Sequence, residues 1–433
     1  MKLDLEQLEA KIGQADLKRS LGRVTKTIGL IIEADGLNVE LGELCYIKTS
    51  EGKIKAEVVG FNDGITELMP LGEIHKIKMG AEVIPSRRQV SIKVGPELIG
   101  RVINAFGEAL DDKPQPRLKE ELAQWGDKIN PLQKERITER LNFGVKAVDG
   151  MLSCGKGQRM GIFAGSGVGK STLMGMIAQN SDADINVIAL VGERAREVRE
   201  FIEESLGPEG LKKSIVIVTT GNEPSLVRVK AALFAHSIAE HFRDQGKDVM
   251  LMLDSITRVA LAQREIGLAT GEPPATRGYT PSVFALIPRL LERSGTGASG
   301  SITALYTVLV EGDDLNEPVS DLCRGVLDGH VVLTRELAYQ NHFPAIDILQ
   351  SVSRVMPSIT SSEHYNKANE IKALIASYRD AQDLINIGAY QQGSNPDIDA
   401  AIQAKPQIDA FLRQGITEFS TIEEVLETMN AIT

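Results

Sequence analysis

Residues 164-AGSGVGKST-172 begin at the last residue of the apolar run 160-MGIFA-164, and they decide the fold. Alternating glycines followed by lysine, serine and threonine have the spacing of a phosphate-binding P-loop. The backbone N–H groups of such glycines can point at phosphate oxygens, and a helix that begins near Lys170 adds the partial positive charge of its amino terminus. The apolar run predicts the strand that must precede the loop. The sequence therefore predicts a nucleotide site between a strand and a helix.

We assign nucleotide binding to the loop residues Gly165, Ser166, Gly167, Val168, Gly169, Lys170, Ser171 and Thr172. Lys170 is expected to reach the β- and γ-phosphates, the Ser171 hydroxyl to ligate Mg²⁺, and Thr172 to lie against the α-phosphate. Ala164 stands where the strict pattern has its first glycine, which the loop tolerates if Ala164 keeps a negative φ. The alternative is a glycine-rich turn that happens to precede a helix.

Two acidic residues follow other apolar runs. Asp254 ends the run 248-DVMLMLD-254, and it is expected to orient the Mg²⁺ shell, usually through a water. Glu193 follows 185-INVIALV-191, and it is the candidate for polarising the attacking water. Arg194, the next residue, completes the set of candidate catalytic residues together with Lys170. The alternative for Glu193 and its charged neighbours is a solvated patch of salt bridges.

The pattern of apolar, polar and glycine residues changes along the chain, and it predicts an α/β protein with additional domains. A short amphipathic helix, with Leu5, Leu8 and Ile12 on one face, is expected within residues 1–22. Short β-rich runs separated by glycine turns predict a small β-barrel over 23–95, the last of these runs being SIKVG. Strand and helix patterns then alternate over 96–357, which predicts a parallel sheet with helices on both faces. Helical periodicity alone over 358–433 predicts a helical domain. The runs predicted as parallel strands are MGIFA, INVIALV, SIVIVTT, DVMLMLD and ITALYTVL.

Composition and charge restrict the functional classes. The 433 residues carry a net charge of −11, which disfavours nucleic acid as the main partner. No apolar stretch reaches the length of a membrane helix, and the amino terminus lacks the apolar core of a secretory signal, so a cytoplasmic location is expected. The cysteines, Cys45, Cys154 and Cys323, are far apart and are interpreted as buried hydrophobic residues.

Three further segments carry a resemblance to a known family: 192-GERAREVREF-201, 253-LDSITR-258 and 344-PAIDILQSVS-353. The last one matches the ten-residue signature of ATP synthase α and β subunits. The chain resembles the rotary and secretion ATPases with a RecA-like core, and within them the flagellar protein-export ATPases and their injectisome relatives. The resemblance runs from about Arg23 to the end of the chain.

This resemblance implies roles for individual residues, with ATP and Mg²⁺ as ligands. It makes Asp254 the Walker B acid and Glu193 the catalytic carboxylate. Phe343 stands where the family places an aromatic ring against adenine. Arg354 matches the arginine finger that enters the site of the adjacent subunit, with a buried salt bridge as its structural alternative. Relatives commonly have glycine at Ala195 and an aromatic residue at Val259, which leaves the pose of Glu193 open.

The resemblance also implies an assembly and its partners. We expect a homohexamer at the inner face of the cell membrane, peripheral to an export gate, that hydrolyses ATP to energise export of flagellar proteins through a type III secretion apparatus. Residues 311–317 resemble a pore loop that contacts a central stalk protein, and 263–265 are expected to connect this loop to the nucleotide site. The helical domain is expected to meet export substrates and chaperones, and the amino-terminal segment a regulatory stator-like protein or a neighbouring subunit.

Other functions stay open at this stage. An injectisome ATPase and a rotary ATP synthase or vacuolar-type catalytic subunit would share the fold. A hexameric RNA or DNA translocase would need exposed aromatic residues on its β domain, where 23–94 contain only Tyr46 and Phe61. A nucleotide-locked structural subunit is disfavoured because Glu193 and Arg354 are both present.

Overall fold

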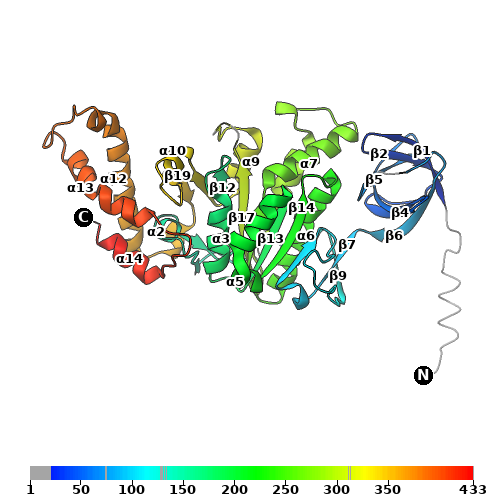
Figure 1. Ribbon diagram of the computed structural model, residues 1–433, viewed down its shortest axis with the longest axis horizontal. Coiled ribbons are helices and arrows are strands. Elements are labelled where there is room, and N and C mark those ends of the chain that lie inside the picture. The colour runs from blue at the N-terminus through cyan, green and yellow to red at the C-terminus, as the bar shows by residue number, and fades with distance from the viewer. Residues whose placement is uncertain are drawn as a thin grey trace, which may run out of the picture. The chain divides into compact units, whose positions relative to one another are not determined.

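The computed structural model describes residues 21–73, 76–126, 134–310 and 314–432, together with residues 130, 132 and 312. They form two compact units (Figure 1). One contains the described residues up to Val90 with Leu268–Glu272, and the other contains Ser91–Gly267 with the residues from Pro273 onward. The amphipathic helix predicted for residues 1–22 lies almost wholly outside the described residues. In the described part of the chain, no helix is long and apolar enough to cross a membrane.

Six antiparallel strands of the first unit close into a barrel, which confirms the predicted β domain. Alternate side chains point inward, so Val24, Ile32, Cys45 and Ile47 form its core. The barrel closes in the order β1-β2-β5-β4-β3-β6. Its strands are β1 (Gly22–Ile28), β2 (Ile31–Asp35), β3 (Glu43–Thr49), β4 (Gly52–Asn62), β5 (Ile65–Pro70) and β6 (Glu82–Gln89).

The barrel ends earlier than the predicted boundary at residue 95. The run SIKVG becomes β7 (Ser91–Val94), which pairs with β9 (Glu120–Ala123) in the second unit. The sixth barrel strand is instead β6, which sequence patterning did not single out. A β-rich run shows that a strand forms but not which strand it pairs with, and this explains the shift.

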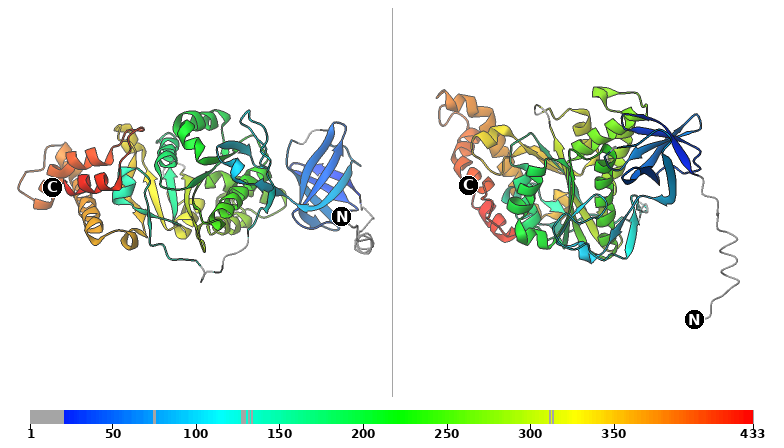
Figure 2. Two further views of the ribbon diagram at one scale, coloured as in Figure 1. Left: turned by 90° about the horizontal axis from the view of Figure 1, so that it is seen from below. Right: turned by 45° about the vertical axis from the view of Figure 1, so that its right-hand side comes forward.

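A mostly parallel sheet forms the centre of the second unit, with helices on both faces (Figure 2). Its order is β19-β18-β12-β17-β15-β13-β14-β8, and only β19 and the short β16 (Gly295–Thr296) run antiparallel to their neighbours. All five apolar runs predicted as strands lie in it. Its strands are β8 (Arg101–Asn104), β12 (Arg159–Ala164), β13 (Ile185–Glu193), β14 (Ser214–Thr220), β15 (Asp248–Asp254), β17 (Ser301–Leu309), β18 (Gly329–Leu333) and β19 (Ile346–Ser353). Helices that contact it or follow its strands include α3 (Lys170–Asn180), α4 (Ala195–Glu200), α6 (Ser225–Asp244), α7 (Ile256–Ala269), α8 (Pro281–Leu291), α9 (Pro318–Val326) and α10 (Arg335–Tyr339).

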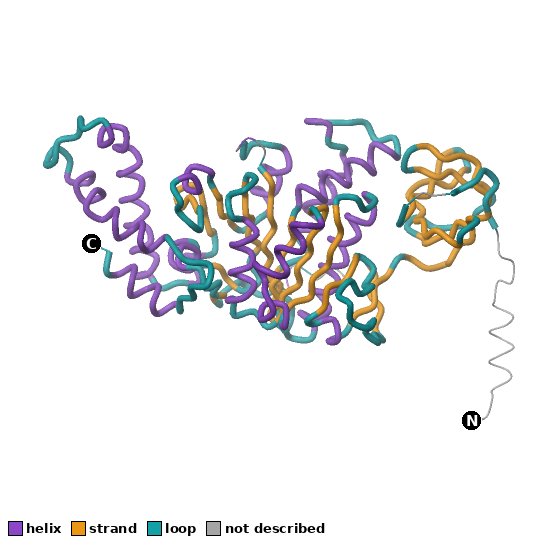
Figure 3. Tube along the Cα trace, in the orientation of Figure 1, coloured by secondary structure: helices purple, strands orange, loops and turns teal. Residues whose placement is uncertain are grey.

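The carboxy-terminal region is helical, as predicted (Figure 3). It contains α12 (Ser362–Asn386), α13 (Pro396–Leu412) and α14 (Ile422–Asn430), each begun by a side-chain cap. These helices share one hydrophobic core with α2 (Lys146–Met151) and the sheet. A Cβ added at Gly150 would lie 2.7 Å from the Phe411 ring, which shows how closely α2 and α13 pack. Residue 358 therefore marks a change of secondary structure within one compact unit.

A buried polar network joins α6 to β17. His236 is fully buried, with Nε2 at 2.9 Å from the Tyr306 hydroxyl and Nδ1 at 2.8 Å from the Ala232 carbonyl. The Tyr306 hydroxyl also lies 2.7 Å from the Ser294 hydroxyl. Burial, helped by the Arg293 guanidinium, lowers the pKa of His236 to about 3. The imidazole is therefore neutral in the folded protein at neutral pH.

The three cysteines are buried and unpaired, as expected.

The network around His236 predicts a pH dependence of stability. Between about pH 6.5 and pH 3 the unfolded His236 binds a proton that the folded protein does not bind, so the free energy of unfolding falls as pH falls through this window. The loss approaches about 1.4 kcal/mol per pH unit. Replacing His236→Gln is expected to reduce the slope by that amount. Urea unfolding at pH 4 to 7 measures it, and identical slopes in the two proteins would contradict a buried neutral imidazole.

Candidate active site

The P-loop has the backbone that phosphate binding requires. Gly167 and Gly169 have φ of 80° and 89°, in the left-handed region that favours glycine. Helix α3 begins at Lys170, as predicted, so its amino terminus faces the loop. Ala164 belongs to strand β12, and its carbonyl accepts the Val310 N–H at 3.0 Å. An extended alanine therefore replaces the first glycine of the motif without strain.

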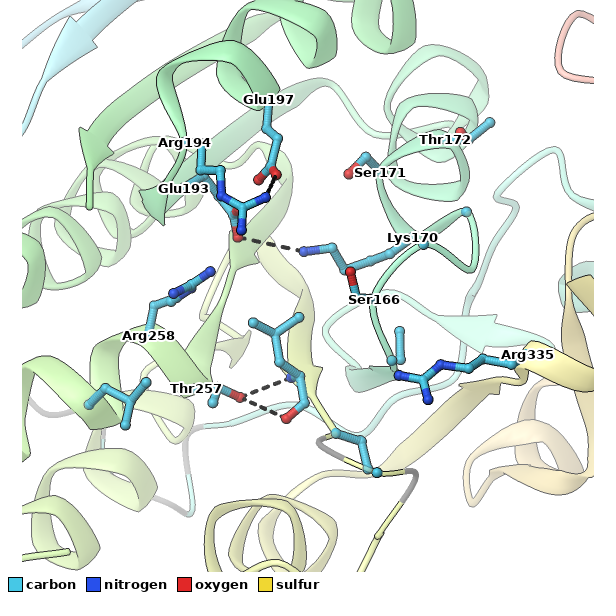
Figure 4. A pocket seen from close by; sticks show the side chains of 18 residues that line it. Ser166, Lys170, Ser171, Thr172, Glu193, Arg194, Glu197, Thr257, Arg258 and Arg335 are labelled. Carbon is cyan, nitrogen blue, oxygen red and sulfur yellow. Dashed lines mark hydrogen bonds and ion pairs between the residues drawn. The ribbon is translucent and has the colours of Figure 1, made fainter. Parts of the chain in front are cut away.

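A cavity of about 650 Å³ opens beside this loop (Figure 4). Val168 is an exception among the predicted loop residues, because its side chain is buried in the hydrophobic core and only its backbone is available to a ligand. The other predicted loop residues meet at the cavity together with Glu193 and Arg194. The lining of the cavity includes Gly165, Ser166, Gly167, Gly169, Lys170, Ser171, Thr172, Glu193 and Arg194.

Lys170 connects the two predicted acids. Its ammonium group contacts Asp254 Oδ1 directly and lies 3.7 Å from Glu193 Oε1. The Thr307 hydroxyl donates a second hydrogen bond to Asp254 Oδ1, at 2.7 Å. The carboxyl ends of parallel strands meet at one edge of a sheet, and this brings the ends of β12, β13 and β15 together. The structure thus assembles the three groups that the sequence placed far apart.

Glu193 has unusual electrostatics. Burial, together with the Asp254 carboxylate, raises the pKa of Glu193 to about 7, against the opposing charge of Lys170. A hydrogen bond with Glu193 lowers the pKa of Glu197, so within this pair Glu193 is the group that binds a proton more readily. Within the described residues, buried Glu193 Oε1 has no hydrogen-bond partner. A polar atom left in this way next to a cavity is available to a water molecule.

The donor set fits a nucleotide with Mg²⁺. The Ser171 hydroxyl and the Asp254 carboxylate are oxygen groups of the kind that Mg²⁺ prefers, and Lys170 supplies a cation for phosphate. The described residues contain no cluster of three or more metal-ligating side chains. A Mg²⁺ ion here would complete its shell with phosphate oxygens and water, as Mg²⁺ commonly does.

Sequence reasoning missed several residues of the site. Arg258 and Arg335 line the cavity, and Thr307 supports Asp254. Arg258 lies four residues beyond the end of β15, and Arg335 lies two residues beyond the end of β18. Inspecting every residue that follows a parallel strand would have found both arginines. The predicted Arg194 is exposed at the cavity, and its guanidinium donates to Glu197 at 2.9 Å.

Of the last two predicted site residues, Phe343 lies beside the P-loop and Arg354 lies away from it. Phe343 is partly exposed and lies against the P-loop, since a Cβ added at Gly169 would be 3.6 Å from its ring. Arg354 follows β19, whose Ser353 pairs with Gly329 at the edge of the sheet opposite the P-loop. Its side chain is exposed, and it donates to the Arg324 carbonyl at 3.3 Å. Among the described residues Arg354 therefore makes no buried salt bridge, and it is not part of the lining of its own chain's cavity.

Comparisons with known proteins agree with this geometry. Family models match the nucleotide-binding domain of the ATP synthase alpha/beta family over residues 144–353 and its beta-barrel domain over residues 24–87. A model of the T3SS EscN ATPase C-terminal domain matches residues 360–431. The chain is 53% identical to the flagellum-specific ATP synthase of Bacillus subtilis, over 98% of this chain and 97% of the relative. This chain belongs to the type III secretion branch of the ATP synthase alpha/beta family.

Two solved structures share the whole architecture. Both contain the assembled ATPase EscN of the enteropathogenic Escherichia coli type III secretion system. The first matches with a TM-score of 0.90 and 44% identity, and the second, a complex with the central stalk EscO, with 0.88 and 43%. Each match covers 95% of this chain and 99% of EscN. The predicted fold and the assignment as a P-loop ATPase are thereby confirmed.

The Thr307 contact leads to a prediction about Mg²⁺. Replacing Thr307→Val removes a hydrogen bond to the Asp254 carboxylate, and losing such a supporting contact weakens metal sites about 10- to 100-fold. We expect the Mg²⁺ concentration for half-maximal ATPase activity to rise by about tenfold. Thr303→Val is the matched control, because Thr303 is a buried threonine of the same strand that bonds Gly157 instead. Equal Mg²⁺ requirements in the two variants would contradict the assigned role.

Proposed function

We propose that this ATPase works as a homohexameric ring that energises export of flagellar proteins through a type III secretion apparatus. The observation that best supports a ring is the position of Arg354. The cavity with the P-loop lies at one edge of the sheet, while the exposed arginine lies at the other edge. A second copy of the chain can supply to this cavity the guanidinium that its own protomer cannot deliver.

In the proposed mechanism each side chain has one task. The P-loop amides and Lys170 hold the phosphates, and Ser171 and Asp254 hold Mg²⁺, which neutralises phosphate charge when bound. In its ionised form, Glu193 orients the attacking water through Oε1, which has no hydrogen-bond partner within the described residues. Arg194, held by Glu197 at the rim, adds positive charge close to Glu193. Phe343 lies against the P-loop, where it can stack on adenine.

Arg354 completes the site of the neighbouring protomer. A guanidinium placed against the γ-phosphate stabilises charge that develops in the transition state, and it accelerates hydrolysis by about 10³ to 10⁵. The exposure of Arg354 leaves its head group accessible to a second protomer. Because the donor and the acceptor belong to different copies, hydrolysis depends on assembly.

The remaining partners follow from the family. The stalk of the EscN–EscO complex supports a central stalk protein in the pore of this ring. The charged segment that ends at Glu317 would contact it, with Asp314 held by Arg277 at 2.9 Å. In the segment proposed to connect this loop to the site, Gln263 bonds Ser282 at 3.1 Å. Export substrates and chaperones would meet the helical domain, and a stator-like regulator the amino-terminal segment, with the ring cytoplasmic and peripheral to a membrane export gate.

The flagellar client is favoured by identity, at 53% to the Bacillus subtilis protein against 44% to the EscN of a virulence-type apparatus. An injectisome would use the same site geometry, and the EscN likeness supports it as the second candidate. Deleting the gene in its native cell and counting flagella by electron microscopy distinguishes the two. Loss of filaments restored by the intact gene supports the flagellar client, and normal filaments exclude it.

The shared site predicts a concentration dependence. ATPase rate per subunit is expected to rise with protein concentration and to level off once rings have formed. Arg354→Ala is expected to bind ATP with unchanged affinity and to hydrolyse it at least a hundredfold more slowly. The control is Arg117→Ala, an exposed arginine outside the site, which should behave like the unmodified protein. A flat rate through the monomer range, or rapid turnover by the Arg354 variant, would refute the shared site.

A further inference from the structure

Helix α9 has a polar contact at each end. At its start, the carboxylate of the cap Glu317 accepts the Ser320 N–H at 3.3 Å and the Tyr279 hydroxyl at 2.9 Å. At its end, the Arg324 carbonyl accepts a hydrogen bond from the Arg354 guanidinium at 3.3 Å. An anion at the amino terminus and a cation at the carboxyl terminus both complement the helix dipole. The same short helix therefore connects Glu317 to the proposed arginine finger.

The chain before α9 reaches the nucleotide cavity of its own protomer. Leu309 and Val310 line that cavity. The Leu309 N–H donates to the Thr257 hydroxyl at 2.9 Å, and the Val310 N–H donates to the Ala164 carbonyl, at the start of the P-loop. A few residues later Glu317 caps the helix. In the sequence, only six residues separate the cavity-lining Val310 from Glu317.

Helix α9 is suited to pass on a displacement. Val319, Ser320 and Cys323 are completely buried, so the helix is held along one side over most of its length. Its nine residues rise about 13 Å, a distance over which an α-helix behaves as a stiff rod. The Arg324 guanidinium also binds back to Asp321 at 3.0 Å, which reinforces the last turn. A shift of the capped end therefore moves the carbonyl that holds Arg354.

We propose that Glu317 is a positioning residue for Arg354. By capping α9 it sets the place of the Arg324 carbonyl, and so the direction in which Arg354 is presented to the neighbouring protomer. Because Leu309 and Val310, shortly before α9, line this protomer's own cavity, the state of one site would control the arginine offered to the next. This inference rests on the proposed role of Arg354 in the adjacent site.

The first test compares single variants in assembled rings. Glu317→Ala is expected to lower kcat about tenfold and to leave the ATP affinity unchanged, because its own cavity keeps every phosphate-binding group. Asn395→Ala removes the side-chain cap of α13 in the same way, with no path to Arg354, and should keep normal activity. Tyr279→Phe removes only the hydroxyl group that donates a hydrogen bond to Glu317, so it should lower kcat by less than Glu317→Ala does. A Glu317 variant that folds, assembles and keeps full kcat overturns the proposal.

Mixed rings test whether Glu317 acts through the neighbour. Lys170→Ala protomers cannot hydrolyse ATP but carry intact Glu317 and Arg354. With these protomers in excess, the ratio of Glu317→Ala activity to unmodified activity should rise from about one tenth toward one. If Glu317 acted only on its own cavity, the ratio would stay at one tenth, and the inference would fail.

Arg354→Ala mixed in the same way is the reference. If Lys170→Ala protomers restore the activity of Arg354→Ala but not that of Glu317→Ala, only the proposed role of Glu317 is overturned. Absence of rescue for Arg354→Ala would overturn the shared site itself, and the inference with it. If Glu317→Ala does not assemble, Tyr279→Phe takes its place in the mixed rings, with the same two outcomes deciding.

Discussion

The ammonium group of Lys170, shared between Asp254 and Glu193, is the interaction on which the rest of the site depends. The partly buried ammonium group faces two buried carboxylates, and burial together with the Asp254 carboxylate favours a proton on Glu193. A bound phosphate chain would draw Lys170 toward itself, and a divalent cation would replace it beside Asp254. The cavity beside these three groups is also lined by Arg194, Arg258 and Arg335, and this positive charge prepares the site for a metal–nucleotide complex.

Sheet topology determines what one protomer can do alone. Parallel strands gather the P-loop, Glu193 and Asp254 at one edge, because all their carboxyl ends point the same way. The antiparallel β19 carries Arg354 to the other edge. On the proposed mechanism this single reversed strand separates the catalytic machinery into two surfaces. The two surfaces meet only when protomers pack head to tail, the arrangement that closes into a ring.

The sequence correctly predicted those elements that a short run of consecutive residues is enough to recognise. The buried strands β12 to β15 and β17 are continuous apolar runs, and the P-loop is a contiguous motif. The barrel strand β6 was missed because it contains Pro85 and its last three residues are exposed and polar, and β7 was assigned to the barrel although it pairs with β9. Thr307 could not be found from its neighbours in sequence, since its contact with Asp254 depends on which strands lie side by side. Strand order is a property of the whole chain, which single segments do not encode.

The departures from the family pattern can be judged from their surroundings. Ala195 is exposed at the start of α4, so its methyl group meets solvent and exerts no steric force on Glu193. Val259 is fully buried in α7, one residue after Arg258, so a smaller side chain there changes the packing behind an arginine that lines the cavity. The pose of Glu193 is set by strand β13 and by the ion pair with Lys170, and neither residue 195 nor residue 259 takes part in these. Of the two positions, Val259 is therefore the one at which the size of the side chain affects packing beside the cavity, and neither position carries a reacting group.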